Sequence, residues 1–218
     1  MTSIELHIFT NATQYAPSVD IITETYNSFI NKFNYDGKVT VWYDPKPNIE
    51  HAEKYLHNLK EIFHTVNITT SLSDGYVRAV KSSTSDFLFM LEHDWKFLPT
   101  LTHSLTEICN VIQEENLIHL RFNKRSNESM FLDKRLEERS ANINYCVTPF
   151  LSNNPHIIKR DIYIHNALQY VQIEEGSLGI EQRLKRVKSL TGAIYGPLGY
   201  PQTVEHLDGR GPEDIIND

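Results

Sequence analysis

The stretch Asp86–Trp95, DFLFMLEHDW, is the segment around which the predicted fold of this chain is organised. Five consecutive apolar residues, Phe87–Leu91, end at two carboxylates that are separated by a single residue. A short apolar run that is rich in aromatic residues predicts a β-strand buried on both faces of a sheet. Because side chains alternate along a strand, Glu92 and Asp94 are expected on one side, with His93 pointing away.

Two like charges this close together are unfavourable unless a cation lies between them or one carboxylate takes up a proton. A hard divalent cation such as Mg²⁺ or Mn²⁺, bound through oxygen, is the simplest partner. In α/β proteins, ligands bind just beyond the carboxyl ends of the sheet strands, where this pair falls. A solvated strand end followed by a turn would give the same residues, so the rest of the chain must discriminate between the two interpretations.

The composition favours one soluble globular domain. The chain has 218 residues, of which 40% are hydrophobic and 22% are charged, as expected for a single large α/β domain. The formal net charge of −7 predicts no broad basic surface and therefore no nucleic-acid partner. No stretch reaches membrane-spanning length and the start lacks a basic leader, so we expect no transmembrane segment and a cytoplasmic location.

Strands and helices alternate along the first 95 residues, which predicts a mostly parallel central sheet flanked by helices and joined by right-handed crossovers. Predicted strands cover residues 4–9, 39–43, 66–70 and 87–91, and predicted helices cover 17–33, 49–63 and 73–82. Farther along, helices are expected over 98–115 and from 179, strands over 117–122, 146–151 and 194–196, and a loop from 196 to the end. Cys109 and Cys146 are expected to be buried free thiols, because they lie far apart without CxxC spacing.

The triplet Glu92-His93-Asp94 resembles the DxD motif of GT-A-fold glycosyltransferases. The resemblance implies a single GT-A-like α/β domain, in which residues 1–95 bind the nucleotide sugar and residues 96–218 bind the acceptor. It implies that Asp94 binds Mn²⁺ or Mg²⁺ on the diphosphate of a donor, in particular a UDP-sugar. Glu92 stands where the usual first Asp would be, so the resemblance gives it a supporting place at the metal and, with His93, at the donor.

Other segments resemble donor-binding parts of the same family. Arg78, within the predicted helix that follows Ser73, is similar to a basic residue that faces the diphosphate. Thr10, Asn11 and Asp44 follow the first two predicted strands, where GT-A folds hold the ribose and base. A solvent-facing arginine and ordinary turn chemistry account for these four residues equally well.

The segment Gly179–Arg186 resembles the acidic segment of inverting GT-A enzymes, whose carboxylate deprotonates the acceptor hydroxyl. Gln182 occupies the second acidic position, so only Glu181 carries over as the general base, with Asp208 and Asp161 in reserve. A carboxylate in a first helical turn is also favourable for the helix dipole alone.

The segment Thr203–Arg210 contains two more candidates. Many GT-A enzymes close the site with a C-terminal histidine that binds the metal, and His206 is similar to it. Imidazole suits Mn²⁺ better than Mg²⁺, and Arg210 could contact a phosphate bidentately. A lone histidine in a loop is more often a solvated residue, so this interpretation requires His206 to lie near Asp94.

The segment Ser152–Arg160, SNNPHIIKR, and the Glu-His-Asp-Trp pattern resemble small virally encoded glycosyltransferases, including those of chloroviruses. That resemblance implies a glycan acceptor on a viral capsid protein and activity in the host cytoplasm. The sequence leaves two alternatives open, namely a non-catalytic nucleotide- or sugar-binding α/β module and a nucleotidyltransferase. The latter usually carries a Gly-rich phosphate loop near its start, and residues 10–18 contain no glycine.

Overall fold

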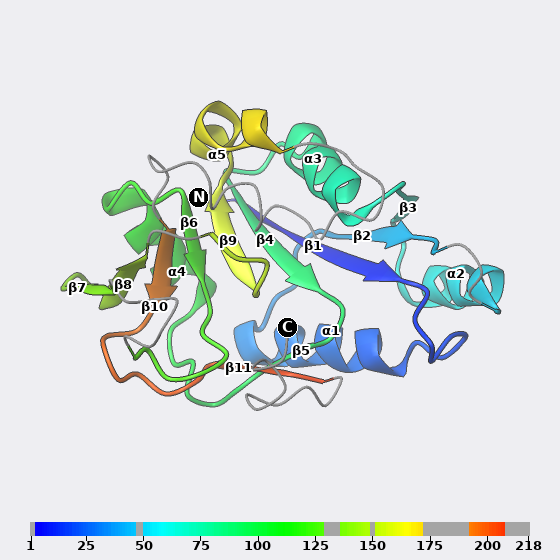
Figure 1. The fold of residues 1–218 in the computed structure, drawn as a ribbon, viewed down its shortest axis with the longest axis horizontal. Coiled ribbons are helices and arrows are strands. Elements are labelled where there is room, and N and C mark those ends of the chain that lie inside the picture. Colours follow the sequence, from blue (N-terminus) through cyan, green and yellow to red (C-terminus); the bar gives the residue numbers. More distant parts are fainter. Residues whose placement is uncertain (1–2, 47–49, 129–135, 149–150, 172–191, 208–218) are drawn as a thin grey trace.

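The computed structural model describes residues 3–46, 50–128, 136–148, 151–171 and 192–207. Within these ranges a nine-stranded sheet lies at the centre, with helices on both faces (Figure 1). The strands are β1 (Ile4–Asn11), β2 (Val39–Asp44), β3 (Val66–Ile68), β4 (Phe87–Glu92), β5 (Trp95–Phe97), β6 (His119–Arg121), β7 (Glu137–Arg139), β8 (Tyr145–Thr148), β9 (His156–Lys159), β10 (Gly192–Tyr195) and β11 (Val204–His206). The α-helices are α1 (Asp20–Phe33), α2 (Ala52–Ile62), α3 (Leu72–Ser82), α4 (Leu105–Glu114) and α5 (Arg160–Asn166), followed by a 3₁₀ turn at Leu168–Tyr170.

The first half of the sheet is parallel, which confirms the alternating pattern predicted from the sequence. The strand order is β3-β2-β1-β4-β9-β6-β10-β8-β7, and β1 pairs in parallel with both β2 and β4. Phe9 on β1 lies opposite Trp42 on one side and Glu92 on the other. This register brings the carboxyl ends of β1, β2 and β4 to one edge of the sheet. Beyond β4 the sheet is mixed, because β9 runs antiparallel to both β4 and β6.

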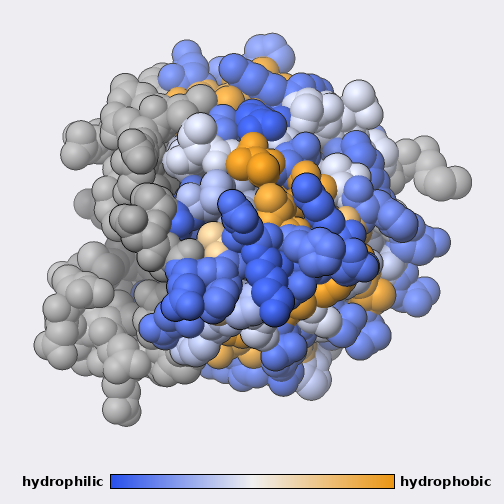
Figure 2. Space-filling model, turned by 90° about the vertical axis from the view of Figure 1, so that its right-hand side faces the viewer, coloured by the Kyte–Doolittle hydropathy of each residue, from blue (hydrophilic) through white to orange (hydrophobic). Residues whose placement is uncertain are grey.

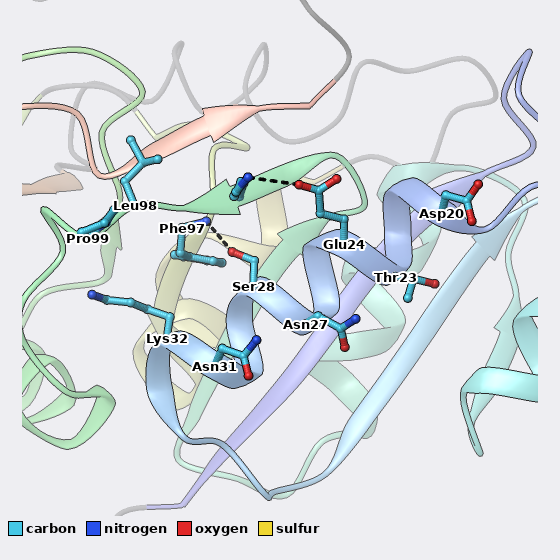
Figure 3. Close-up of a pocket in the computed structure, with 11 residues that line it drawn as sticks. Asp20, Thr23, Glu24, Asn27, Ser28, Asn31, Lys32, Phe97, Leu98 and Pro99 are labelled. Atoms are coloured by element: carbon cyan, nitrogen blue, oxygen red, sulfur yellow. Dashed lines mark hydrogen bonds and ion pairs between the residues drawn. The ribbon is translucent and has the colours of Figure 1, made fainter.

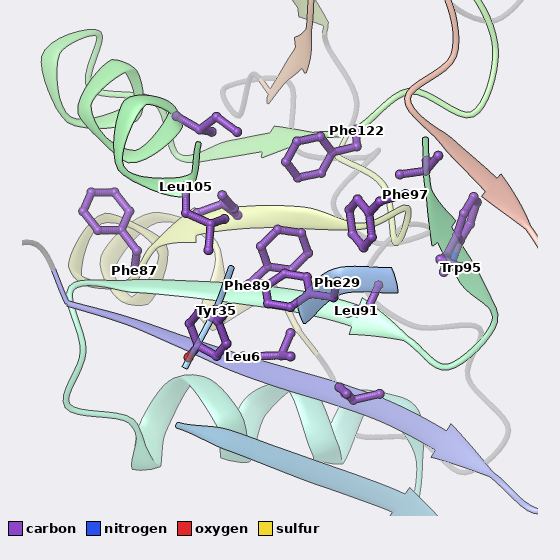
Figure 4. Packing of buried hydrophobic residues seen from close by; sticks show 14 of the residues in the cluster. Leu6, Phe29, Tyr35, Phe87, Phe89, Leu91, Trp95, Phe97, Leu105 and Phe122 are labelled. Carbon is purple, nitrogen blue, oxygen red and sulfur yellow. The ribbon is translucent and has the colours of Figure 1, made fainter. Parts of the chain in front are cut away.

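Two hydrophobic clusters hold the layers together. The larger cluster joins one face of the sheet to α1, α2 and α4, and Phe29, Phe89, Phe97 and Phe122 lie at its centre (Figure 4). The rings of Phe89 and Phe122 stack with their centroids 5.5 Å apart, and Phe29 meets Phe89 edge-on at 4.7 Å. Burial of each such side chain contributes roughly 1.5–3 kcal/mol, so this cluster fixes α1 against β4 and β5.

The second cluster packs α3 and α5 onto the opposite face. Gly75 lets α3 approach closely, because a Cβ at this position would lie 3.2 Å from Phe9 Cδ1 and 3.3 Å from Trp42 Cβ. The next residue, Tyr76, stacks on Phe9 with ring centroids 4.1 Å apart. The helix therefore lies directly over β1 and β2.

The structure differs from the sequence prediction after Trp95. The predicted helix over 98–115 begins only at Leu105, because Ser104 and Glu107 form a capping box there. Residues 95–97 form β5 instead, and the predicted loop from 196 contains β11, which pairs antiparallel with β5. A three-residue strand has little local signal of its own and forms only when its partner is in place.

Both cysteines are buried and free, as predicted. Burial raises the pKa of the Cys109 thiol to about 12, so this group is an unreactive packing residue. Among the described residues, no helix combines the length and apolarity required to cross a membrane.

Candidate functional site

The turn after β4 differs from the predicted continuous strand. Strand β4 ends at Glu92, His93 and Asp94 form a turn, and β5 begins at Trp95. The strand alternation from which Glu92 and Asp94 were expected on one side therefore ends at Glu92 and does not extend to Asp94. The buried Thr25 on α1 sets the turn: its hydroxyl donates to the carbonyl oxygen of His93 at 2.6 Å and accepts from the backbone N–H of Trp95 at 3.1 Å.

Strand β11 brings His206 to this turn. His206 lies opposite Trp95 in the β5–β11 ladder, and their rings meet edge-on with centroids 4.7 Å apart. His206 Nε2 is 3.3 Å from Asp94 Oδ2, and the backbone N–H of Leu207 donates to the Asp94 carbonyl oxygen at 2.7 Å. The structure therefore brings Asp94 and His206 together, as the metal-site interpretation requires.

Asp94 has an unusual environment for a carboxylate. The residue is 8% exposed, and its Oδ1 atom is buried without a hydrogen-bond partner among the described residues. The indole Nε1 of the adjacent Trp95 is also buried and has no partner there. A buried acceptor without a partner costs about 1–3 kcal/mol, and more when charged, so this oxygen is suited to a bound ligand.

The donor set fits a divalent cation. Two donor atoms 3.3 Å apart can both reach one ion at bond lengths of about 2.1 Å. No group of three or more His, Cys, Asp or Glu side chains with metal-binding geometry occurs in the described ranges. Three predicted site residues, Glu181, Asp208 and Arg210, lie outside these ranges.

Polar residues from three strand ends gather on the α3 side of the sheet. Asn11 and Asp44 lie opposite each other at the ends of β1 and β2, and Glu92 ends β4. Alternation along the strands puts all three on the face that carries Phe9 and Trp42. Asp44 is 8% exposed and accepts a hydrogen bond from Lys46 Nζ at 2.6 Å. Figure 2 shows the molecule from the side of α2 and β3, where hydrophilic residues surround a central band of hydrophobic ones.

Thr10 does not join this group. Its side chain points to the other face of the sheet, where its hydroxyl lies 2.7 Å from the hydroxyl oxygen of Tyr55 on α2. Burial raises the pKa of that phenol to about 12, so Tyr55 stays neutral. The Thr10 hydroxyl therefore anchors α2 rather than lining the α3 face.

Arg78 lies on α3 above β2. Its Nη1 donates to the carbonyl oxygen of Ile68 at 2.6 Å, and its guanidinium carbon is 5.3 Å from the centre of the Trp42 ring. Because β1 separates β2 from β4, the backbones of β2 and β4 are about 10 Å apart. The structure thus places Arg78 on the Asp44 side of the site rather than beside Asp94.

Asp161 lies at the opposite end of β4 from Asp94. It is in the first turn of α5, where the backbone N–H of Arg160 donates to the Asp86 carbonyl oxygen at 2.9 Å. Asp86 precedes the six-residue strand β4 and Asp94 follows it, which separates them by roughly 20 Å. The structure therefore does not bring Asp161 together with the other candidates.

The roles of Thr25 and of the β5–β11 ladder were not predicted from the sequence. Thr25 is fully buried on the α1 face that also buries Ile22 and Phe29. A hydroxyl at an apolar helical position was the available signal, because such a group must find a buried partner.

Comparisons with known proteins place this geometry in a fold. Neither a protein-family model nor a curated protein sequence matches the chain. Among solved structures, S. aureus TarS (residues 1–349) matches with a TM-score of 0.57 and 14% identity, over 99% of this chain and 62% of that one. GalNAc-T7 with UDP, GalNAc and Mn²⁺ matches with a TM-score of 0.61 and 12% identity, over 94% of this chain and 44% of that one. Both neighbours are GT-A glycosyltransferases. The chain has the GT-A fold.

This GT-A chain spans less than two thirds of the length of either neighbour. At identities of 12–14% the likeness shows the fold alone. Within that fold, the Asp94 turn lies at the carboxyl end of β4, next to β1. The GT-A fold predicted from the sequence is thereby confirmed, while the roles of the individual residues are proposals.

Proposed function

We propose that the chain is a metal-dependent glycosyltransferase that moves a sugar from a nucleotide diphosphate donor, a UDP-sugar in particular, to a glycan acceptor. The observation that carries this proposal is the Asp94–His206 pair, in which Asp94 Oδ1 is buried without a hydrogen-bond partner among the described residues. The GT-A fold supports it, as does the UDP and Mn²⁺ in the GalNAc-T7 structure.

In this proposal Asp94 and His206 hold Mn²⁺ or Mg²⁺, with Glu92 in a supporting place at the end of β4. The imidazole nitrogen of His206 favours Mn²⁺ over Mg²⁺. When bound, the cation supplies positive charge where negative charge develops on the leaving diphosphate. Asn11 and Asp44 hold the ribose and base at the neighbouring strand ends.

The remaining roles rest on the sequence resemblance. Arg210 would contact a phosphate, and His93 would contribute to donor binding. Glu181 would take the proton of the acceptor hydroxyl if the reaction inverts the anomeric centre, with Asp208 in reserve. We expect Glu181→Gln to preserve donor binding and to slow transfer by about 10²–10⁴-fold. Unchanged turnover in this variant would remove Glu181 from the mechanism.

The acceptor is the least constrained part of the proposal. The resemblance of Ser152–Arg160 to viral glycosyltransferases supports a glycan carried by a capsid protein, modified in the host cytoplasm. Incubation of the protein with UDP-sugars, Mn²⁺ and separated capsid glycopeptides, followed by mass spectrometry for added hexose, tests this acceptor class.

Calorimetric titration with UDP and several UDP-sugars, with and without Mn²⁺, tests the function itself. We expect Mn²⁺-dependent binding and slow hydrolysis of one donor, and we expect Asp94→Ala to lose both while its circular dichroism spectrum is unchanged. Nucleotide binding that ignores Mn²⁺, without hydrolysis of any donor, would instead identify a non-catalytic binding module.

A further inference from the structure

A groove lined by both polar and apolar residues lies outside the Asp94 site, between α1 and the segment that begins with β5 (Figure 3). Its volume is about 710 Å³, within the range of small-molecule binding sites. One wall is the outer side of α1, and the other is formed by β5 with Leu98 and Pro99. The backbone N–H of Phe97 donates to Ser28 Oγ at 2.7 Å, which joins the two walls at the base.

The α1 wall presents amide side chains. Asn27 and Asn31 are four residues apart, so they lie on one side of the helix about 6 Å from each other. Both are exposed, and neither side chain has a hydrogen bond to any residue in the described ranges. Asn is a weaker helix former than Ala, Glu or Lys. Two of them on an exposed helical face are therefore unexplained by helix stability and are available for a ligand.

The charges that line the groove cancel. Asp20 and Glu24 contribute two negative charges, and Lys32 and Lys96 contribute two positive charges, which gives a formal sum of zero. Lys96 Nζ lies 3.2 Å from Glu24 Oε1, so one cation and one anion already neutralise each other. A neutral groove disfavours nucleic acid, anionic lipid and strongly acidic peptides, because each needs an excess of positive charge.

An uncharged saccharide matches both walls. Its hydroxyl groups can donate to and accept from the amides of Asn27 and Asn31. The C–H faces of its rings can pack against Leu98 and Pro99 on the other wall. The spacing of the two amides is comparable with the length of one sugar residue in a chain.

The groove lies next to the Asp94 turn along β5. Strand β5 leads directly from the Asp94 turn, and Lys96 lies within 3.8 Å of Glu205, the neighbour of His206. We propose that this groove binds the neutral part of the acceptor glycan, beyond the residue that receives the sugar. This inference rests on the proposed glycosyltransferase function and adds a substrate class to it.

The test uses the double variant Asn27→Ala and Asn31→Ala in the full chain. Alanine preserves the helix, and Asn110→Ala, at an exposed position in the middle of α4, is the matched control. Neutral oligosaccharides of two to four hexose residues serve as probes, and NMR follows the side-chain amide signals of Asn27 and Asn31. We expect these signals to shift, and we expect the double variant to raise the acceptor KM roughly tenfold with unchanged kcat.

The outcomes separate the groove from the donor site. Asp94→Ala should keep the oligosaccharide-induced shifts at Asn27 and Asn31 while it loses Mn²⁺-dependent UDP binding. The groove proposal is overturned if none of the probes shifts these amides, or if the double variant has the same acceptor KM as Asn110→Ala. In either case normal Mn²⁺-dependent UDP binding leaves the transferase proposal standing. A wild-type protein without such binding overturns the transferase proposal and with it the acceptor role of the groove.

Discussion

His206 Nε2 lies 3.3 Å from Asp94 Oδ2, although the two residues come from opposite halves of the chain. Antiparallel pairing of β11 with β5 creates this contact, because it sets His206 opposite Trp95, the residue after Asp94. Neither short strand has much pairing surface alone. The pair of donor atoms therefore depends on the support that α1 and the aromatic cluster give to β5.

Asp94→Asn and His206→Ala should each weaken Mn²⁺-dependent UDP binding by at least about tenfold, since each removes a proposed metal ligand. Asp94→Asn should leave the metal-free stability equal or higher, because it removes a buried charge whose Oδ1 atom has no hydrogen-bond partner among the described residues. Calorimetry with and without Mn²⁺ measures the first effect, and urea denaturation measures the second. Glu205→Gln, at the neighbouring position of β11, is the control that should respond to Mn²⁺ as the wild type does.

Thr25→Val should destabilise the protein by about 1–3 kcal/mol and weaken Mn²⁺ binding. The substitution keeps the shape but leaves the His93 carbonyl and the Trp95 N–H buried without their partner. Thr25→Ser keeps the hydroxyl and should retain Mn²⁺ affinity while losing only about 1 kcal/mol for the missing methyl group. Equal Mn²⁺ affinities in the two variants would show that the turn does not need this hydroxyl for metal binding.

Asp44→Ala should weaken binding of uridine and UDP in the absence of metal by about five- to tenfold, as expected for one lost hydrogen bond. The prediction follows from the position of Asp44 opposite Asn11 at the carboxyl edge of the sheet. Fluorescence or calorimetric titration without Mn²⁺ measures the effect separately from the metal site. Asp36→Asn, in the exposed turn before β2, should bind both ligands normally.

The stability of the fold should decrease as the pH falls below about 6.5, in part because of His119. Burial lowers the pKa of this imidazole well below its usual value, and the nearby His156, whose ring centre is 4.3 Å away, lowers it further. Below pH 6.5 the unfolded chain therefore binds a proton that the folded chain does not, so unfolding becomes easier by up to about 1.4 kcal/mol per pH unit. Urea denaturation between pH 7.5 and 5 measures this slope.

His119→Gln should reduce the dependence of the unfolding free energy on pH by up to the contribution of one proton, about 1.4 kcal/mol per pH unit. The substitution keeps an N–H that can donate to the Ser152 carbonyl oxygen. Some slope should persist, because burial also lowers the pKa of His7. An unchanged slope in His119→Gln would show that His119 does not titrate differently in the folded and unfolded chains.

Local pattern was sufficient for the first half of the molecule. The apolar run Phe87–Leu91 and the alternation of strands with amphipathic helices predicted the parallel half of the sheet, and its register follows from burial. The positions of Asn11, Asp44 and Glu92 at one edge also followed, because parallel strands end on the same side. After Trp95 the helix predicted over 98–115 was too long, because residues 95–97 form β5 and the capping box at Ser104 starts α4 only at Leu105.

Sequence pattern predicted the mostly parallel sheet and the carboxylates at the end of β4, and the resemblance to GT-A enzymes added the fold class and a candidate metal-binding histidine. Tertiary structure alone decided that His206 reaches Asp94, that Arg78 lies over β2, and that Asp161 lies at the far end of β4. The physical reason is the separation along the sequence between the residues that determine each feature. Strand and helix patterns are encoded by neighbours within a few residues, whereas these positions depend on pairings and packing between segments that only the folded chain brings into contact.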